Sequence, residues 1–204
     1  YIVFDGTAFF CFGCWHHSHR GFGPRVAGHR IRRFFPRRYG DGAVPGVTVG
    51  EPDGRASPRM TALEELGSNS ALNLVISTDI KAQLWRKVLG LTPAAGLSCL
   101  TRLPLGRIRE TPESWDLLQE AMAEVVAVAQ AEGIGLGEID IQSVSASVRE
   151  FMPPTWRGSL VTDLEAGRQL EVEWLHGAIC RLGKKHGIDT PFHRMVLGAL
   201  MPYA

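Results

Sequence analysis

From about residue 57 onward, the hydrophobic positions of the chain recur in patterns that predict regular secondary structure. Residues 57–66 open with Ser-Pro, which is typical of a helix start, and predict a short helix. Residues 72–76 form a short apolar run that predicts a strand. In the Gly- and Pro-rich connector that precedes them, residues 44–49 predict another short strand, followed by a turn at residues 52–54.

Apolar residues at the spacing of one helix face dominate the rest of the chain. One such helix begins after Asp79, and a second covers residues 111–133, where Thr-Pro-Glu supplies a capping side chain, a first-turn proline and an acid. Residues 170–185 and 190–200 predict two more. Because each helix has one apolar face, residues 79–204 predict a helical bundle. The predicted fold class is therefore mainly α, with a few short strands.

The first 40 residues have a different composition. They hold seven of the nine Phe, four of the seven His and seven Arg but one acid, which gives a net charge of +6 against −5 for the remaining 164 residues. They show no sustained period of 3.6 or 2, so residues 1–42 are predicted to form an irregular basic segment. The whole chain carries +1. This balance argues against a protein defined by binding to nucleic acid or to an anionic membrane.

Two motifs within this segment suggest alternative functions. Cys11-x-x-Cys14 is followed by three histidines within five residues, and these are ligand types that bind zinc. The histidines follow Cys14 too closely for the usual finger, and a second ligand pair is lacking, so no metal site is predicted. The Arg- and Phe-rich residues 30–38 could contact phosphates, but they equally fit a disordered basic tail, and we predict no nucleic-acid partner.

Localisation signals are also lacking. No stretch approaches the roughly 20 apolar residues of a membrane span, and the start of the chain has no basic signal-peptide region. Four cysteines are too few and too scattered for a disulfide framework, which favours a reducing compartment. Cys99 and Cys180 lie at apolar helical positions and are interpreted as core residues. The chain is predicted to be a cytoplasmic protein without a membrane partner.

Two ionisable residues fall on apolar helix stripes. At 100° per residue, Lys87 borders the stripe of its helix, whereas Arg86 faces away. Glu171 lies in the middle of the stripe of its own helix, whereas Glu173 points to solvent. If Lys87 and Glu171 face one cleft, burial would lower the pKa of the lysine and raise that of the glutamate, as in general acids. The structural alternatives are a lysine that extends its amine to solvent and a glutamate in an exposed first turn.

Two longer segments resemble a known family. They are WRKVLGLTPAAGLSCLTRLPLG, which begins at Trp85, and RGSLVTDLEAGRQLEVEWLHGAICRLGKKHGIDTP, which begins at Arg157. In order and spacing they resemble the carboxy-terminal domain of ketopantoate reductases (2-dehydropantoate 2-reductases), over about residues 43–204. The resemblance implies a helical domain similar to that of 6-phosphogluconate dehydrogenase. It also implies the NADPH-dependent reduction of 2-dehydropantoate to pantoate, on the route to pantothenate and coenzyme A.

The resemblance implies a role for three residues. Lys87 would protonate the developing alkoxide while hydride arrives from the nicotinamide, and Glu171 would hydrogen-bond the hydroxyl end of the substrate. Ser159 would donate to the substrate carboxylate or to a neighbouring oxygen. The helix positions of Lys87 and Glu171 point to the same two residues independently.

Several positions depart from the family pattern. Many members carry asparagines where this chain has Leu91 and Ala95. The family's Asn-Gly after the glutamate is His176-Gly177 here, and the first serine of its Ser-Ser-Met element is Gly158. With these departures, the resemblance still implies a 2-keto acid substrate. A related 2-keto acid becomes an alternative to 2-dehydropantoate itself.

The resemblance also implies a preceding nucleotide-binding domain with a strand, a GxGxxG turn and a helix. The chain contains no GxGxxG, so its NADPH-binding residues are unknown. We predict three parts: residues 1–42 as a remnant or misread part of that domain, residues 43–78 as its end and a connector, and residues 79–204 as the helical catalytic domain. Two functions stay open: an oxidoreductase that needs a nucleotide domain, and a non-catalytic helical module that binds a partner or forms a homodimer.

Overall fold

The computed structural model describes residues 2–4, 46–69 and 73–204. It divides into two compact units, Tyr1–Ile80 and Lys81–Ala204, which we call the N-terminal and C-terminal units. The predicted histidine- and cysteine-rich motif and the Arg- and Phe-rich run lie outside the described residues.

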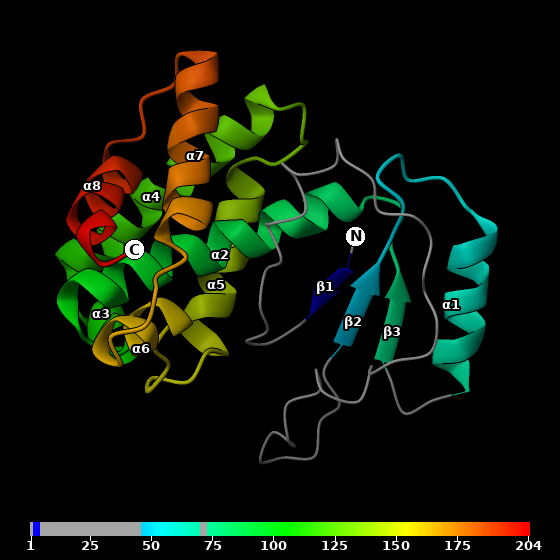
Figure 1. Cartoon of the computed structure of the whole chain (residues 1–204), viewed down its shortest axis with the longest axis horizontal. Helices are drawn as coiled ribbons and strands as arrows, with labels where there is room; N and C mark the ends of the chain where they lie inside the picture. The colour runs from blue at the N-terminus through cyan, green and yellow to red at the C-terminus, as the bar shows by residue number, and fades with distance from the viewer. Residues whose placement is uncertain (1, 5–45, 70–72) are drawn as a thin grey trace. The chain divides into compact units, whose positions relative to one another are not determined.

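The N-terminal unit contains a small sheet and one helix (Figure 1). Its strands are β1 (Ile2–Phe4), β2 (Gly46–Val49) and β3 (Asn73–Ile76), in the order β1-β2-β3. β1 and β2 are antiparallel, whereas β2 and β3 are parallel, with Val47 opposite Leu74. The short strand β1 lies within the segment that was predicted to be irregular, and at this point the prediction was wrong.

Helix α1 (Pro58–Ser68) connects the two parallel strands. It begins as predicted at Ser57, whose side chain accepts a hydrogen bond from the backbone amide of Met60. It packs on β3 where Gly67 faces Leu74: a Cβ atom on Gly67 would lie 2.8 Å from the Cβ atom of Leu74. A strand, a crossover helix and a parallel strand form a βαβ unit, the building block of nucleotide-binding domains.

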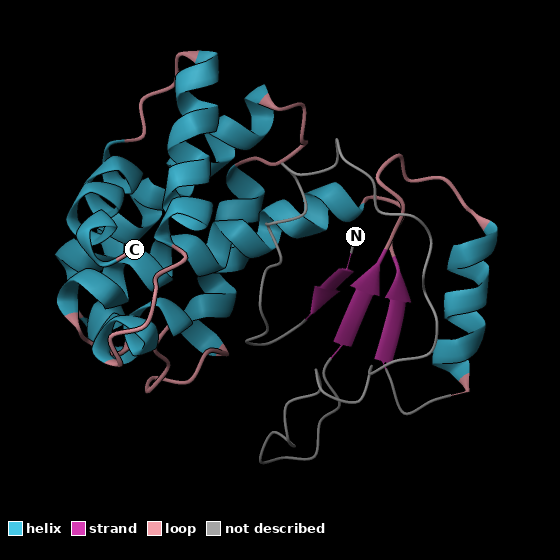
Figure 2. Cartoon of the chain, in the orientation of Figure 1, coloured by secondary structure: helices cyan, strands magenta, loops and turns pink. Residues whose placement is uncertain are grey.

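The C-terminal unit consists of helices, as predicted (Figure 2). In chain order they are α2 (Ile80–Thr101), α3 (Leu105–Glu110), α4 (Pro112–Ala131), α5 (Glu138–Glu150), α6 (Ser159–Glu165), α7 (Val172–His186), α8 (Pro191–Leu200) and a terminal 3-10 turn (Met201–Tyr203). Helix α2 is longer than its predicted stripe, because it continues through Pro93.

Helix α4 forms the centre of this unit. Its residues Leu118, Met122 and Val125 are fully buried, and it contacts α3, α5, α7 and α8. The hairpin of α7 and α8 turns at Gly187, which adopts the left-handed conformation (φ +68°) that glycine tolerates best. The same helix end is close-packed, since a Cβ atom on Gly183 would lie 2.8 Å from the carbonyl oxygen of Ile188.

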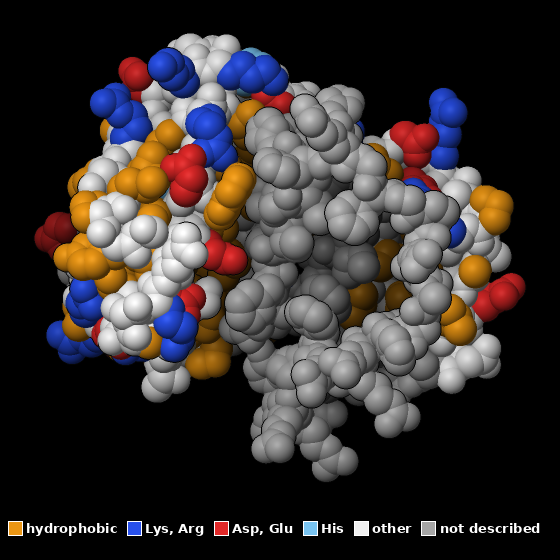
Figure 3. Space-filling view, viewed as in Figure 1, with side chains coloured by type: hydrophobic (Ala, Val, Ile, Leu, Met, Phe, Trp, Pro, Cys, Tyr) orange, Lys and Arg blue, Asp and Glu red, His pale blue; other side chains and the backbone are white. Residues whose placement is uncertain are grey.

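None of the described helices is long and apolar enough to cross a membrane. On the face shown in Figure 3, the C-terminal unit carries basic and acidic side chains interspersed with apolar ones.

Candidate functional site

Helices α6 and α7 both pack on one turn of α2. A Cβ atom on Gly158, the N-cap of α6, would lie 2.9 Å from the Cβ atom of Ala95. A Cβ atom on the next residue of α2, Gly96, would lie 2.5 Å from Cε1 of His176 on α7. The first approach needs small residues on both helices, and the second needs a glycine on α2 to admit the histidine ring. Together they bring the start of α6 and the first turns of α7 to the same part of α2.

Lys87 lies on α2 before this meeting point. It is half-buried and stands eight residues before Ala95, which corresponds to about 12 Å along the helix axis. Leu91 lies between them, four residues from each, so the three positions follow one side of α2. The neighbouring Arg86 points elsewhere, as predicted: its Nε atom donates to Oδ1 of Asp140 on α5 at 2.8 Å.

Glu171 is exposed at the N-cap of α7, and the prediction that it lies in the middle of the buried face was wrong. The buried residues of this helix are centred one quarter-turn away. We call Val172, His176, Ile179 and Gly183 the packed face of α7, and Glu171, Trp174, Leu175 and Leu182 its open face. The structural alternative of an exposed first turn describes Glu171 better.

The buried face of α7 differs from its predicted apolar stripe because helix packing depends on the shape of the side chains as well as on their hydrophobicity. The packed face includes a histidine and a glycine, which a search for apolar residues overlooks, but these residues allow α7 to approach α2 and the turn after Gly187 closely. Of the apolar residues of α7 predicted to be inward, Ala178 and Ile179 are buried as predicted, but Trp174 is 43% exposed. Glu173, predicted to face solvent, forms an ion pair with Arg181 on the surface of α7.

The surroundings of Glu171 change its acidity. Partial burial, and to a smaller extent the negative charge of Asp163, raise the pKa of its carboxyl group above the usual range. Asp163 belongs to α6 and is itself paired with Arg168, with 2.7 Å between Oδ1 and the guanidinium. A carboxyl with a raised pKa holds its proton more readily, which is useful in a group that hydrogen-bonds a substrate oxygen.

Ser159 is the first residue of α6 and is exposed. Asp163 follows Ser159 by one helical turn, so the two residues lie on the same side of α6. The charge of Asp163 acts on Glu171 from this side. The loop before Ser159 is anchored to α3, because the amide of Leu105 donates to the carbonyl oxygen of Trp156 at 2.9 Å. Ser159 and Glu171 thus lie at the starts of α6 and α7, and Lys87 lies about two turns before Ala95, the residue of α2 that Gly158 approaches.

A buried polar cluster was missed by the sequence reasoning. Glu124 on α4 lies 2.7 Å from Nδ1 of His193 on α8, and the His176 ring stacks beside His193 with 5.1 Å between centroids. Both histidines are fully buried. A histidine at a core position of α7 and another of α8 could have predicted this cluster. Only His176 was considered, as a departure from the family pattern.

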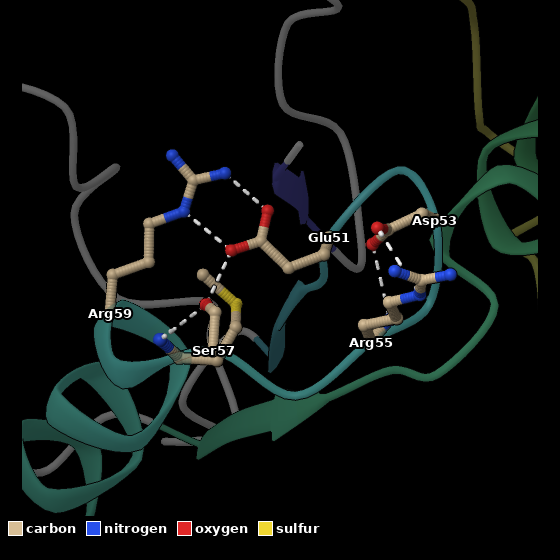
Figure 4. A network of polar contacts seen from close by, with 6 residues as sticks. Glu51, Asp53, Arg55, Ser57 and Arg59 are labelled. Atoms are coloured by element: carbon tan, nitrogen blue, oxygen red, sulfur yellow. Dashed lines mark hydrogen bonds and ion pairs between the residues drawn. The ribbon is translucent and has the colours of Figure 1, made fainter.

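The N-terminal unit holds a second polar cluster that sequence reasoning missed (Figure 4). Glu51 follows β2, and its buried carboxylate accepts hydrogen bonds from Ser57 and Arg59, both at 2.5 Å to Oε1. These bonds, that of Arg59 first, lower the pKa of Glu51 to about 2. The cluster fixes the loop after β2 to the start of α1, and a surface depression beside it is lined by Asp53 and Arg55 among others.

Among the described residues, no group of three or more His, Cys, Asp or Glu side chains is arranged to hold a metal ion. The groups available for chemistry at the candidate site are thus an ammonium, a carboxyl with a raised pKa and a hydroxyl. Together they can donate protons and hydrogen bonds to an oxygen-rich substrate.

Comparison with known proteins decides the family. Residues 79–204 match the family model described as "Ketopantoate reductase PanE/ApbA C terminal". The chain belongs to this family. The 2-dehydropantoate 2-reductase of Caulobacter vibrioides is 31% identical over 168 residues, which cover 82% of this chain and 53% of that protein. The chain thus spans about half the length of the curated relatives it matches.

Solved structures show the same fold. The 2-dehydropantoate 2-reductase of Methylococcus capsulatus matches with a TM-score of 0.69 and 27% identity, over 78% of this chain and 50% of that chain. A ketopantoate reductase from Staphylococcus aureus, described as dimeric, matches with a TM-score of 0.69 and 23% identity, over 78% of this chain and 53% of that chain. The predicted family and the predicted helical fold are confirmed.

Proposed function

We propose that this chain provides the substrate-binding helical domain of an NADPH-dependent reductase that converts 2-dehydropantoate, or a related 2-keto acid, to the 2-hydroxy acid. The reaction would serve pantothenate and coenzyme A biosynthesis in the cytoplasm. The observation that carries the proposal is the family match, because residues 79–204 include all three candidate residues.

NADPH, when bound, would supply a hydride for the keto carbon of the substrate. The ammonium group of Lys87 would donate a proton to the carbonyl oxygen. The carboxyl of Glu171 hydrogen-bonds the hydroxyl end of the substrate, and the hydroxyl of Ser159 donates to its carboxylate. The raised pKa of Glu171 and the position of Ser159 at the neighbouring helix start support these roles.

The packing of α6 on α2 supports a substrate that differs from 2-dehydropantoate. Two positions that depart from the family pattern, Ala95 and Gly158, touch each other: the Cβ atom that a serine would add at residue 158 would lie 3.2 Å from the Cα atom of Ala95 as well as 2.9 Å from its Cβ atom. The polar side chains that many family members carry there cannot be accommodated without a shift of α6. A substrate with fewer polar groups on this side fits the replacement.

Two partners belong to the proposal. NADPH would be held mainly by a nucleotide domain, since the chain has no GxGxxG sequence and spans about half of its relatives. A homodimer is the second, and the dimeric ketopantoate reductase of similar fold supports it. A non-catalytic interaction module derived from such a reductase is not favoured, because the match extends over the whole helical domain.

Turnover in the presence of a nucleotide domain tests the role of Lys87. NADPH oxidation with 2-dehydropantoate and other 2-keto acids is followed in the longest protein that contains this chain and is active. Removal of a general acid should lower kcat by about 10²–10⁴-fold in Lys87→Ala. The control is Lys81→Ala on the exposed first turn of the same helix, which should keep the kcat of the unchanged protein. An unchanged kcat in Lys87→Ala would contradict the proposed role.

A further inference from the structure

The C-terminal helix α8 is attached to the rest of the bundle through the cluster of Glu124, His176 and His193. We propose that this cluster is an acid-sensitive latch. It holds α8 on α4 and α7 at neutral pH, and it loosens at acid pH, where a buried histidine of the cluster must accept a proton. The inference concerns helix docking and is independent of the proposed enzymatic function.

Glu124 caps α8 from a different helix. Its carboxylate accepts hydrogen bonds from the backbone amides of Phe192 (2.8 Å) and His193 (3.2 Å), which lie in the first turn of α8. The N-cap residue Thr190 makes no side-chain capping bond, so Glu124 satisfies amides that a helix start leaves without partners. Its negative charge also lies at the positive end of the helix dipole. Removal of this carboxylate would therefore leave the start of α8 uncapped.

His193 extends the contact into the core. Its Nδ1 atom lies 2.7 Å from Oε2 of Glu124, and a carboxylate can only accept, so Nδ1 donates. Its Nε2 atom is buried without a hydrogen-bond partner among the described residues. The latch thus has one well-bonded histidine nitrogen and one buried nitrogen that faces away from the carboxylate.

His176 is the group on which acidity would act. Both of its ring nitrogens are buried without hydrogen-bond partners within the described part of the chain, and its ring lies against Gly96 of α2. Burial, followed by the neighbouring His193, lowers its pKa well below the usual value. A positive charge on this ring would be fully buried and without a hydrogen-bond partner among the described residues.

The elements around His176 offer little compensation. Helix α2 presents Gly96, which has no side chain, and α8 presents the rings of His193 and Phe192. From α4, Glu124 faces the cluster, and its carboxylate is already bonded to the His193 ring and to two amides of α8. On α7 itself, Glu173 lies about one turn before His176 and forms an ion pair with Arg181, and Cys180 lies about one turn after it, where burial raises the pKa of its thiol.

The sign of the effect follows from this environment. When α8 is docked, His176 stays neutral below the ordinary histidine pKa of about 6.5, whereas in the unfolded chain it binds a proton. The stabilisation is therefore complete above about pH 6.5 and declines as the pH falls. For one histidine, the unfolding equilibrium constant rises about tenfold per pH unit well below pH 6.5, which amounts to about thirtyfold between about pH 8 and about pH 5.0.

Urea unfolding of the whole chain at a series of pH values tests the latch. The variant His176→Asn removes the titrating ring, and we expect it to lose most of the thirtyfold increase whatever its stability at neutral pH. The matched control is His186→Asn at the exposed end of the same helix, where His186 pairs with Glu132. This control should keep the steep dependence attributed to His176.

An NMR titration of the histidine ring protons gives a second measurement that needs no variant. We expect the ring of His176 to stay neutral until the amides of α8 lose their protection from hydrogen exchange. The proposal is overturned if His176 titrates near pH 6.5 while α8 stays protected. It is also overturned if His176→Asn unfolds with the same pH dependence as the unchanged protein. If the variant does not fold, the ring titration alone decides.

Discussion

The two faces of helix α7 show how differently one helix can use its residues. The packed face places His176 and Gly183 in the interior, with His176 fully buried and Gly183 in close contact with the chain that returns to α8. The open face carries the larger apolar side chains Trp174, Leu175 and Leu182, yet Trp174 and the candidate residue Glu171 are exposed. Close approach between helices thus decides which face is buried, more than hydrophobicity does.

This difference separates stability from function. A side chain on the packed face contacts α2, α4 or α8, and its loss leaves a cavity. A side chain on the open face is surrounded partly by solvent, so a change there affects the folded state little. We therefore expect substitutions on the packed face to have large effects on stability. Substitution of Glu171, at the start of the open face, should affect mainly substrate binding.

The largest effect on stability is expected for a substitution on the packed face, compared with a matched substitution on the open face. Ile179 is 2% exposed, so Ile179→Ala should destabilise the chain by about 2–5 kcal/mol. Leu182 is only half-buried, and Leu182→Ala should cost less than half as much. Urea unfolding followed by circular dichroism at neutral pH measures both. Equal losses would show that the open face is as well packed as the other.

The substitution Glu171→Gln is expected to stabilise the folded chain, by less than Ile179→Ala destabilises it. Because the folded-state pKa of Glu171 is raised, its ionisation destabilises the folded chain at pH values above the ordinary glutamate pKa. The amide removes this penalty and should stabilise the chain at neutral pH by less than about 0.5 kcal/mol, since the side chain is exposed. Below about pH 4, where both states are protonated, the gain should disappear.

The control for this substitution is Glu173→Gln, two residues further on. It breaks the surface ion pair with Arg181 and should not stabilise the chain. Thermal unfolding of the three proteins at two pH values measures the difference. A lower melting temperature for Glu171→Gln at neutral pH would mean that Glu171 serves the fold of α7.

Much of the fold follows from sequence signals that act locally. The helix starts at Ser57-Pro58, Thr111-Pro112 and Thr190-Pro191 were predictable, because a proline is tolerated in the first helical turn and ends a preceding element. The end of α7 at Gly187 was predictable for a similar reason. Helices α3, α5 and α6 were missed. In α3 and α6, six or seven residues are too few for a periodic pattern.

The candidate site was only partly accessible from the sequence. The positions of Lys87 and Glu171 on their helices were noticed, but burial of the Glu171 stripe was wrongly inferred from its large apolar residues. The close contacts of Gly158 with Ala95 and of Gly96 with His176 join residues far apart in the chain. Such contacts depend on small side chains, which leave no periodic signal, so the meeting of α6 and α7 on α2 could not be predicted.

Whether Lys87, Ser159 and Glu171 belong to one 2-keto acid site is tested most directly by an NMR titration. The longest active protein that contains this chain is titrated with 2-dehydropantoate and other 2-keto acids in the presence of NADPH. The account predicts that amide signals shift together around these three residues, that Lys87→Ala weakens the response, and that Lys81→Ala leaves it unchanged. Signals that do not shift around these residues at saturating 2-keto acid, or shifts that Lys87→Ala leaves intact, would contradict it.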